Sequence, residues 1–103
     1  MKKIIKLRQY TNDFAENKDI AKKIRIEEII PSLSNGEEVI IDFDKVTGAT
    51  QSFIHALISD PIRELKNIAF DNLYYQNANN DIREIISIVY RYLQESLEIN
   101  NER

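Results

Sequence analysis

The sequence contains no cysteine, one histidine and two glycines. Without cysteine the chain can form no disulfide and no thiolate metal site, and His55 alone cannot build a histidine metal cluster. Neither Gly36 nor Gly48 precedes a Lys-Ser or Lys-Thr pair, and the two are twelve residues apart. This excludes the glycine patterns of P-loop and dinucleotide-binding proteins. We therefore expect no metal ion and no cofactor.

Long apolar segments are also missing. No apolar run is long enough to cross a membrane, and the N-terminus lacks a signal-peptide pattern, so we expect a cytoplasmic protein with no membrane partner. The formal net charge of −3 at pH 7 argues against nucleic acid as a direct partner. A length of 103 residues fits one domain over 1–103, with a frayed polar tail at 100–103.

What the chain does contain is an alternation of short apolar runs and helical periodicity, which predicts the order β-α-β-α-β-α. The predicted strands are 3–8, 38–43 and 67–73, and the predicted helices cover 17–33, the region from 51 onward and 81–97. Such an order is typical of an α/β fold with a small, mostly parallel sheet covered by helices. A fourth strand is expected, if present, within 44–50 or 10–14.

Two helices are predicted to be irregular. In 17–33 the apolar stripe of Ala21 and Ile24 shifts by about half a turn to Ile26 and later residues, so this helix is expected to bend or divide near Pro31. The next helix is expected to break at Ser59, because Asp60-Pro61 followed by Glu64 is a helix-start pattern.

The chain is organised around residues 39–58. A buried strand, Val39–Phe43, leads through a short polar loop to a helix that begins near Gln51. Gly48 is free to take a positive φ in this loop. Backbone N–H groups at a helix N-terminus favour an anion or a phosphorylated hydroxyl. The residues expected at this point are Thr50, Gln51 and Ser52.

This segment resembles the core of a STAS domain, the family of sulfate transporters and anti-sigma factor antagonists. Asp42 falls on the strand-end Asp of the family pattern, Val46 on its loop Val, and Thr50–Phe53 on its Asp-Ser-Ser-Gly. The match is closer to uncharacterised prokaryotic STAS-like proteins, which carry a segment similar to Asp42-Phe43, Val46 and Ser52-Phe53. The resemblance covers most of the chain in element order.

The resemblance implies a non-enzymatic regulatory module that works by partner switching. In such regulators an ATP-dependent kinase phosphorylates the second Ser of the motif, which corresponds to Ser52. The implied partner is another protein, in particular an ATPase of the histidine-kinase fold. The expected partner-binding residues are Thr47, Gly48, Thr50, Gln51, Ser52, Phe53 and His55.

The residues themselves leave plainer interpretations open. Ser52 or Thr50 can serve only as a helix cap. Asp42 and Asp44 share one side of a strand if it continues, but strand-end carboxylates usually accept hydrogen bonds from loop N–H groups. His55 follows Ser52 by one helical turn, yet a Ser-His pair needs an orienting acid and an oxyanion hole to act as a nucleophile. We therefore expect no catalytic residue.

Two other function classes remain open. One is a structural or assembly subunit that forms a homodimer through the last helix or an open sheet edge. The other is an accessory subunit of a DNA-associated or phage-related regulatory system.

Several basic residues near the N-terminus are expected to form a solvated face balanced by nearby glutamates, namely Lys2, Lys3, Lys6, Arg8, Lys22, Lys23 and Arg25.

Overall fold

The computed structural model describes residues 2–101, with side chains for residues 2–95. Its central sheet has three strands in the order β1-β3-β5, all parallel: β1 (Lys2–Lys6), β3 (Glu38–Asp42) and β5 (Leu73–Gln76). The predicted central strand is therefore the middle one. The predicted α/β class with a mostly parallel sheet is confirmed.

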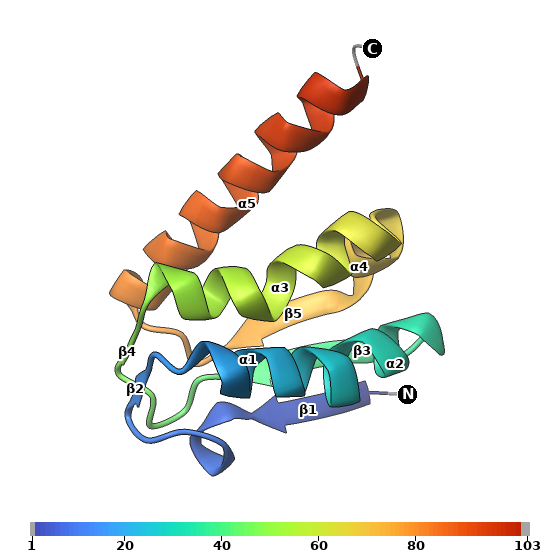
Figure 1. The fold of residues 1–103 in the computed structure, drawn as a ribbon. Helices are drawn as coiled ribbons and strands as arrows, with labels where there is room; N and C mark the ends of the chain where they lie inside the picture. Colours follow the sequence, from blue (N-terminus) through green and yellow to red (C-terminus); the bar gives the residue numbers. More distant parts are fainter. Residues whose placement is uncertain (1, 102–103) are drawn as a thin grey trace.

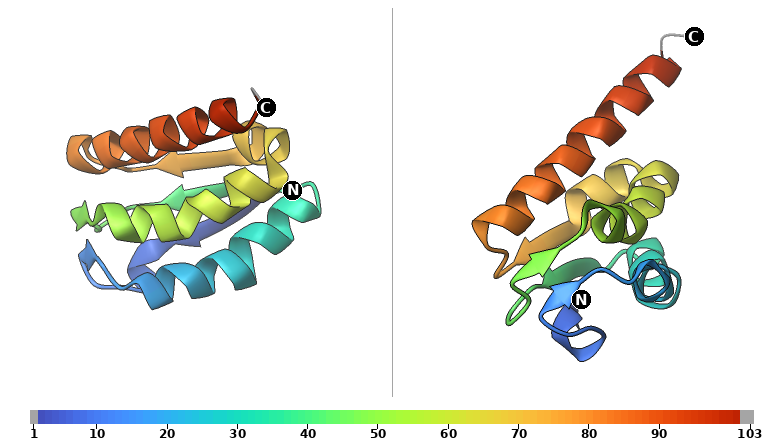
Figure 2. Two further views of the ribbon diagram at one scale, coloured as in Figure 1. Left: turned by 45° about the horizontal axis from the view of Figure 1, so that its top comes forward. Right: turned by 60° about the vertical axis from the view of Figure 1, so that its left-hand side comes forward.

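Helices occupy one face of this sheet (Figures 1 and 2). In chain order the helical elements are η1 (Leu7–Gln9), α1 (Lys18–Ile24), η2 (Arg25–Ile29), α2 (Ile30–Ser34), α3 (Gln51–Leu65), α4 (Asn67–Asn72) and α5 (Asn80–Asn101), where η1 is a 3-10 turn and η2 is π-helical. The core between sheet and helices contains Ile5, Val39, Ile41 and Leu73 from the strands, and Ile24, Leu33, Phe53, Leu57, Ile62, Ile82 and Val89 from the helices. Within the described residues, none of the helices is long and apolar enough to cross a membrane.

The first helical run is continuous from α1 through η2 to α2. A π turn takes five residues instead of four, so the buried positions step from Ile24 to Ile29. This extra residue explains the shift of the apolar stripe in the sequence. Ile26, which the shifted stripe included, is 51% exposed, so that assignment was wrong. Pro31 comes directly after the π turn, where the regular bonding between residues four apart is already interrupted, so its missing N–H is tolerated there. The irregularity of this helical run therefore lies at 25–29, just before Pro31.

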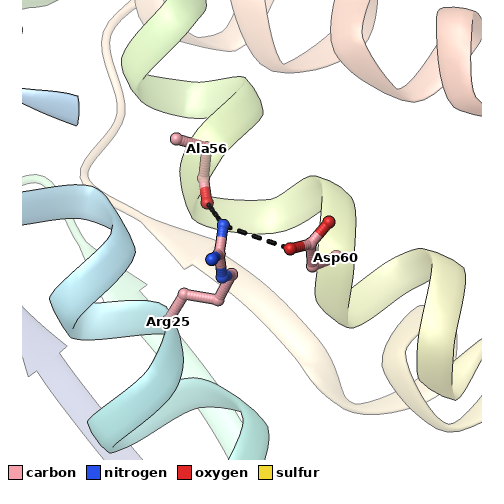
Figure 3. Close-up of polar contacts among 3 residues, drawn as sticks. All are labelled: Arg25, Ala56 and Asp60. Atoms are coloured by element: carbon pink, nitrogen blue, oxygen red, sulfur yellow. Dashed lines mark hydrogen bonds and ion pairs between the residues drawn. The ribbon is translucent and has the colours of Figure 1, made fainter. Parts of the chain in front are cut away.

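Helix α3 does not break at Ser59, and the predicted new start at Asp60-Pro61 was wrong. The Arg25 side chain, which reaches α3 from η2, explains the position of Asp60 (Figure 3). Its Nη1 donates a hydrogen bond of 3.0 Å to the carbonyl of Ala56 and lies 3.3 Å from Oδ2 of Asp60. Asp60 pairs with Arg25, and the buried stripe of Leu57, Ile58 and Ile62 continues past it, so α3 runs on as one helix. The helix ends at Leu65, because Lys66 takes a positive φ of 48°.

The third predicted strand, 67–73, was also largely wrong. Asn67–Asn72 forms the short helix α4, and only Leu73 belongs to the strand. The left-handed turn at Lys66 starts this new helical segment, in which the Phe70 N–H donates to the Lys66 carbonyl. The strand then uses the two tyrosines Tyr74 and Tyr75, whose aromatic side chains suit a pleated surface.

Both loops that were expected to hide a fourth strand contain a short one. β2 (Phe14–Ala15) and β4 (Gly48–Ala49) pair with each other in parallel and form a separate two-stranded ladder.

Before the last helix, Asn79 Oδ1 accepts a hydrogen bond of 2.9 Å from the Ile82 N–H and so caps α5. Helix α5 reaches Asn101, and residues 102–103 of the predicted tail lie outside the described residues.

Candidate functional site

The loop that joins β3 to α3 is shaped by a turn at Lys45 and by a close contact at Gly48. Lys45 has a φ of 64°, and the Val46 N–H donates to the Phe43 carbonyl at 2.9 Å. Gly48 is not among the residues with positive φ, so the role expected for it falls to Lys45. The lack of a side chain at Gly48 instead leaves room for the Phe14 ring, because a Cβ on residue 48 would lie only 2.7 Å from Cδ1 of Phe14. A larger residue would push the Phe14 ring away.

This loop is held from two sides by hydrogen bonds. The Thr47 N–H donates to the Asp13 carbonyl at 2.8 Å, and the Thr50 N–H donates to the Ala15 carbonyl at 3.0 Å. On the other side, Asn79 Nδ2 donates to the Thr47 carbonyl at 2.7 Å. The segment that leads into α3 is therefore fixed by neighbours from β2 and from the start of α5.

Asp42 anchors the carboxyl end of β3. Its carboxylate accepts hydrogen bonds from Asn77 Nδ2 at 2.9 Å, the Asp44 N–H at 2.9 Å and Gln76 Nε2 at 3.3 Å. Burial by itself raises the pKa of this carboxyl, but the three donors outweigh it and hold the pKa below its ordinary value. Asp44 lies exposed in the turn beyond the strand. The carboxylate of Asp42 thus satisfies loop and side-chain donors.

The N-terminus of α3 separates the roles of Thr50 and Ser52. Thr50 has an extended backbone, and its Oγ1 accepts a hydrogen bond of 3.0 Å from the Phe53 N–H, so Thr50 is the cap. Ser52 is in the first turn of the helix with an exposed side chain. Within the described part of the chain, its hydroxyl makes no side-chain hydrogen bond. The Ser52 hydroxyl is therefore available for another interaction.

An open hollow of about 530 Å³ lies beside this helix start, between the N-terminal turns of α1 and α3. It is lined by Lys18, Gln51, Ser52, His55 and Ala56. The rings of His55 and of Tyr92 from α5 also lie in a T-shaped arrangement, with ring centroids 6.2 Å apart. The positively charged Lys18 side chain and the exposed Ser52 hydroxyl thus line the same hollow at a helix N-terminus.

The structure brings together only part of the predicted residue set. Gln51, Ser52 and His55 line the hollow, and Thr47 is exposed on the adjoining loop. Gly48 and Thr50 shape the backbone instead. Phe53, which was expected at the partner-binding surface, is fully buried and anchors α3 in the core.

Lys18 was not among the site residues predicted from the sequence, in which it lay only within the predicted helix 17–33. The signal that it is near Ser52 is tertiary, because it depends on α1 and α3 packing side by side with their N-termini at the same end. Within the described residues, no three histidine, aspartate or glutamate side chains gather in a way that would hold a metal ion.

A comparison with protein families supports the resemblance. The model of a family described as a STAS-like domain of unknown function matches residues 20–83, which is more than half of the chain. This range includes β3, the loop and all of α3. No curated protein and no solved structure matched the chain.

Proposed function

Because the chain belongs to the STAS-like domain family, we propose that it is a non-enzymatic regulatory module that binds another protein around Thr47–His55. Two features support this site. The loop is held in place by hydrogen bonds from both sides, so a partner meets a preformed surface. The side chains of Thr47, Gln51 and Ser52 are exposed on it.

Phosphorylation of Ser52 is the proposed switch. The observation that supports it is that Thr50, and not Ser52, caps helix α3. Because Thr50 caps the helix, the exposed Ser52 hydroxyl can be modified without loss of the cap. A kinase would move the γ-phosphoryl group of ATP to Ser52 Oγ, with ADP leaving and the hydroxyl proton passing to a base of the kinase. Phe53 does not obstruct this hydroxyl, because its ring is buried.

A phosphate at Ser52 would change the hollow in charge and in shape. It carries a charge of about −2 at neutral pH, and the helix N-terminus stabilises that charge. The ammonium group of Lys18, which lines the same hollow, can pair with the phosphate. A partner that inserts a side chain into the unmodified hollow would then be displaced. In keeping with the STAS resemblance, the partner is proposed to be an ATPase of the histidine-kinase fold.

The test compares charge variants at Ser52 in binding to a partner that co-purifies from the native cell. Isothermal titration should give equal affinities for wild type and Ser52→Ala, because alanine leaves the surface unmodified. Ser52→Asp should bind about ten-fold more weakly, which corresponds to ~1.4 kcal/mol. The matched control is Ser34→Asp, which adds the same charge at the exposed end of α2.

Equal affinity of Ser52→Asp and wild type would remove Ser52 as the switch. Mass spectrometry of the purified chain provides a second, independent readout, since a phosphate on Ser52 is expected in part of the population. Partner binding that survives Thr47→Arg and Gln51→Arg together would place the docking surface elsewhere.

A further inference from the structure

The sheet face opposite the helices carries an ordered pattern of apolar and charged residues. Strand register places Ile4, Ile40 and Tyr74 in one row across the three strands. Ile4 is 50% exposed and Tyr74 is 45% exposed, whereas Ile5 and Ile41 in the next row are buried beneath the helices. Figure 2 shows the helices gathered on the other side of the sheet. The row is therefore an apolar band on an uncovered face.

Charged residues flank this band in two columns of opposite sign. On β1 the same face carries Lys2 and Lys6, one on each side of the apolar row. On β3 the register partners of these lysines are Glu38 and Asp42. The face thus has a basic column next to an acidic column, with isoleucines between the charges in both.

We propose that this face binds the same face of a second copy of the chain. A two-fold axis parallel to the strands, between β1 and β3, places β1 of each copy over β3 of the other. Lys2 then faces Glu38 of the second copy, and Ile4 faces its Ile40. The same contacts recur with the copies exchanged, as a two-fold interface requires. Each lysine gains a second acidic neighbour and each isoleucine gains an apolar one.

Other ways of pairing two copies set like charges against each other. If the axis runs across the strands through the isoleucine row, Lys2 lies over Lys6 of the second copy, and Glu38 lies over its Asp42. Pairing two β1 strands edge to edge in antiparallel fashion about Ile4 also sets Lys2 opposite Lys6, which is destabilising. The charge pattern therefore selects the face-to-face arrangement about an axis along the strands.

The size of the face limits how tightly two copies can bind. With the axis between β1 and β3, only these two strands of each copy overlap, so the contact covers roughly 10 Å by 17 Å, given the usual strand spacing and rise. This is below the area of a standard stable interface, so a dissociation constant on the order of 100 µM is expected. Because Asp42 is only 5% exposed, most of the charge selectivity should come from Lys2 and Glu38.

The test uses charge reversals that are complementary to each other. In a dimer of Lys2→Glu, residue 2 of one copy and residue 38 of the other are both acidic. In a dimer of Glu38→Lys, the same two residues are both basic. Each variant alone should dimerise at least about ten-fold more weakly than wild type by sedimentation equilibrium up to about 1 mM. An equal mixture of the two variants should dimerise within about three-fold of wild type, because its charges are again opposite. Lys22→Glu, a charge reversal on exposed α1, is the matched control and should dimerise as wild type does.

Three results would overturn the proposal: a wild type that stays monomeric over the whole range, a dimer that persists in both charge variants, or a mixture that associates no better than its components. Ile4→Glu gives a check that does not depend on charge pairing, since it should abolish the dimer while the circular dichroism spectrum stays unchanged. This interface lies on the face opposite α3. Its failure therefore leaves the Ser52 proposal standing, and the reverse also holds.

Discussion

The two faces of the central sheet are made from alternate residues of the same three strands, yet they have different surroundings. Ile41 is buried beneath the helices, whereas its neighbour Ile40 is half-buried on the uncovered face. The same contrast separates Tyr75 from Tyr74. Parallel sheets usually have both faces covered, and their strands then consist of almost only apolar residues. The lysines and glutamate within β1 and β3 indicate that this sheet is covered on one side only.

The largest expected difference between the faces is the cost of losing an isoleucine side chain. Ile41→Ala should lower the free energy of unfolding by about 3–4 kcal/mol, because it leaves a cavity in a packed core. Ile40→Ala should cost less than about 1 kcal/mol in the monomer, since solvent can fill the space. Urea titration at low protein concentration measures both values. Equal losses at the two positions would show that the faces are equally packed.

Asp42 differs from the other residues of the uncovered face because it is buried. Gln76 and Asn77, whose side chains donate hydrogen bonds to its carboxylate, lie against it. Its pKa in the folded chain lies below the ordinary value of 3.8, so the folded state favours the charged form. That contribution is present above pH 3.8 and is lost as the pH falls through the folded pKa. Asp42→Asn should cost about 2 kcal/mol at pH 7.

The measurement for Asp42 is the free energy of unfolding of wild type and Asp42→Asn between pH 7 and pH 2. The difference between them should shrink as acid protonates the wild-type carboxyl. Asp44→Asn is the control, because Asp44 is exposed and its side chain should matter little. A difference that stays constant down to low pH would show that Asp42 acts through shape and not through charge.

The elements that sequence reasoning placed correctly are those whose local pattern agrees with their packing. The apolar run of β3 and the long periodic helix α5 belong to this group. The start of α3 near Gln51 followed from the strand-loop-helix order alone. In each case the signal lies within a few neighbouring residues, so no knowledge of distant contacts was needed.

The errors occur where a distant contact or an unusual backbone turn, neither of which the neighbouring residues reveal, decides the local structure. Asp60-Pro61 is a good helix start by itself, but Arg25, far away in sequence, binds Asp60 and Ala56 within a continuous helix. The left-handed turn at Lys66 replaced a predicted strand by α4, although lysine gives no warning of a positive φ. Lys18 was missed at the candidate site for the same reason, since only the packing of α1 against α3 brings it near Ser52.

The smallest expected difference between the faces is that between the two adjacent tyrosines of β5. The hydroxyl of Tyr75 is 2.7 Å from the hydroxyl of Tyr90, within the helix-covered side. Burial raises the pKa of Tyr75 well above 10.0. The hydroxyl of Tyr74 donates a hydrogen bond of 2.8 Å to the Asp71 carbonyl in an exposed position. Loss of the buried pair should matter more, because it leaves a half-buried hydroxyl on Tyr90 without its partner.

Tyr75→Phe should therefore lower the free energy of unfolding by about 1 kcal/mol, and Tyr74→Phe by less than about 0.5 kcal/mol. The pH dependence separates them further. A tyrosine whose folded pKa is raised contributes stability that is complete below pH 10.0 and is lost as the pH rises toward the folded pKa. Urea titrations at pH 8 and pH 11 should show that wild type and Tyr74→Phe lose stability at the higher pH, whereas Tyr75→Phe loses less. Tyr75→Phe could instead lose as much stability between pH 8 and pH 11 as wild type and Tyr74→Phe do. In that case the buried pair of hydroxyls would not be the feature that distinguishes the covered face at β5.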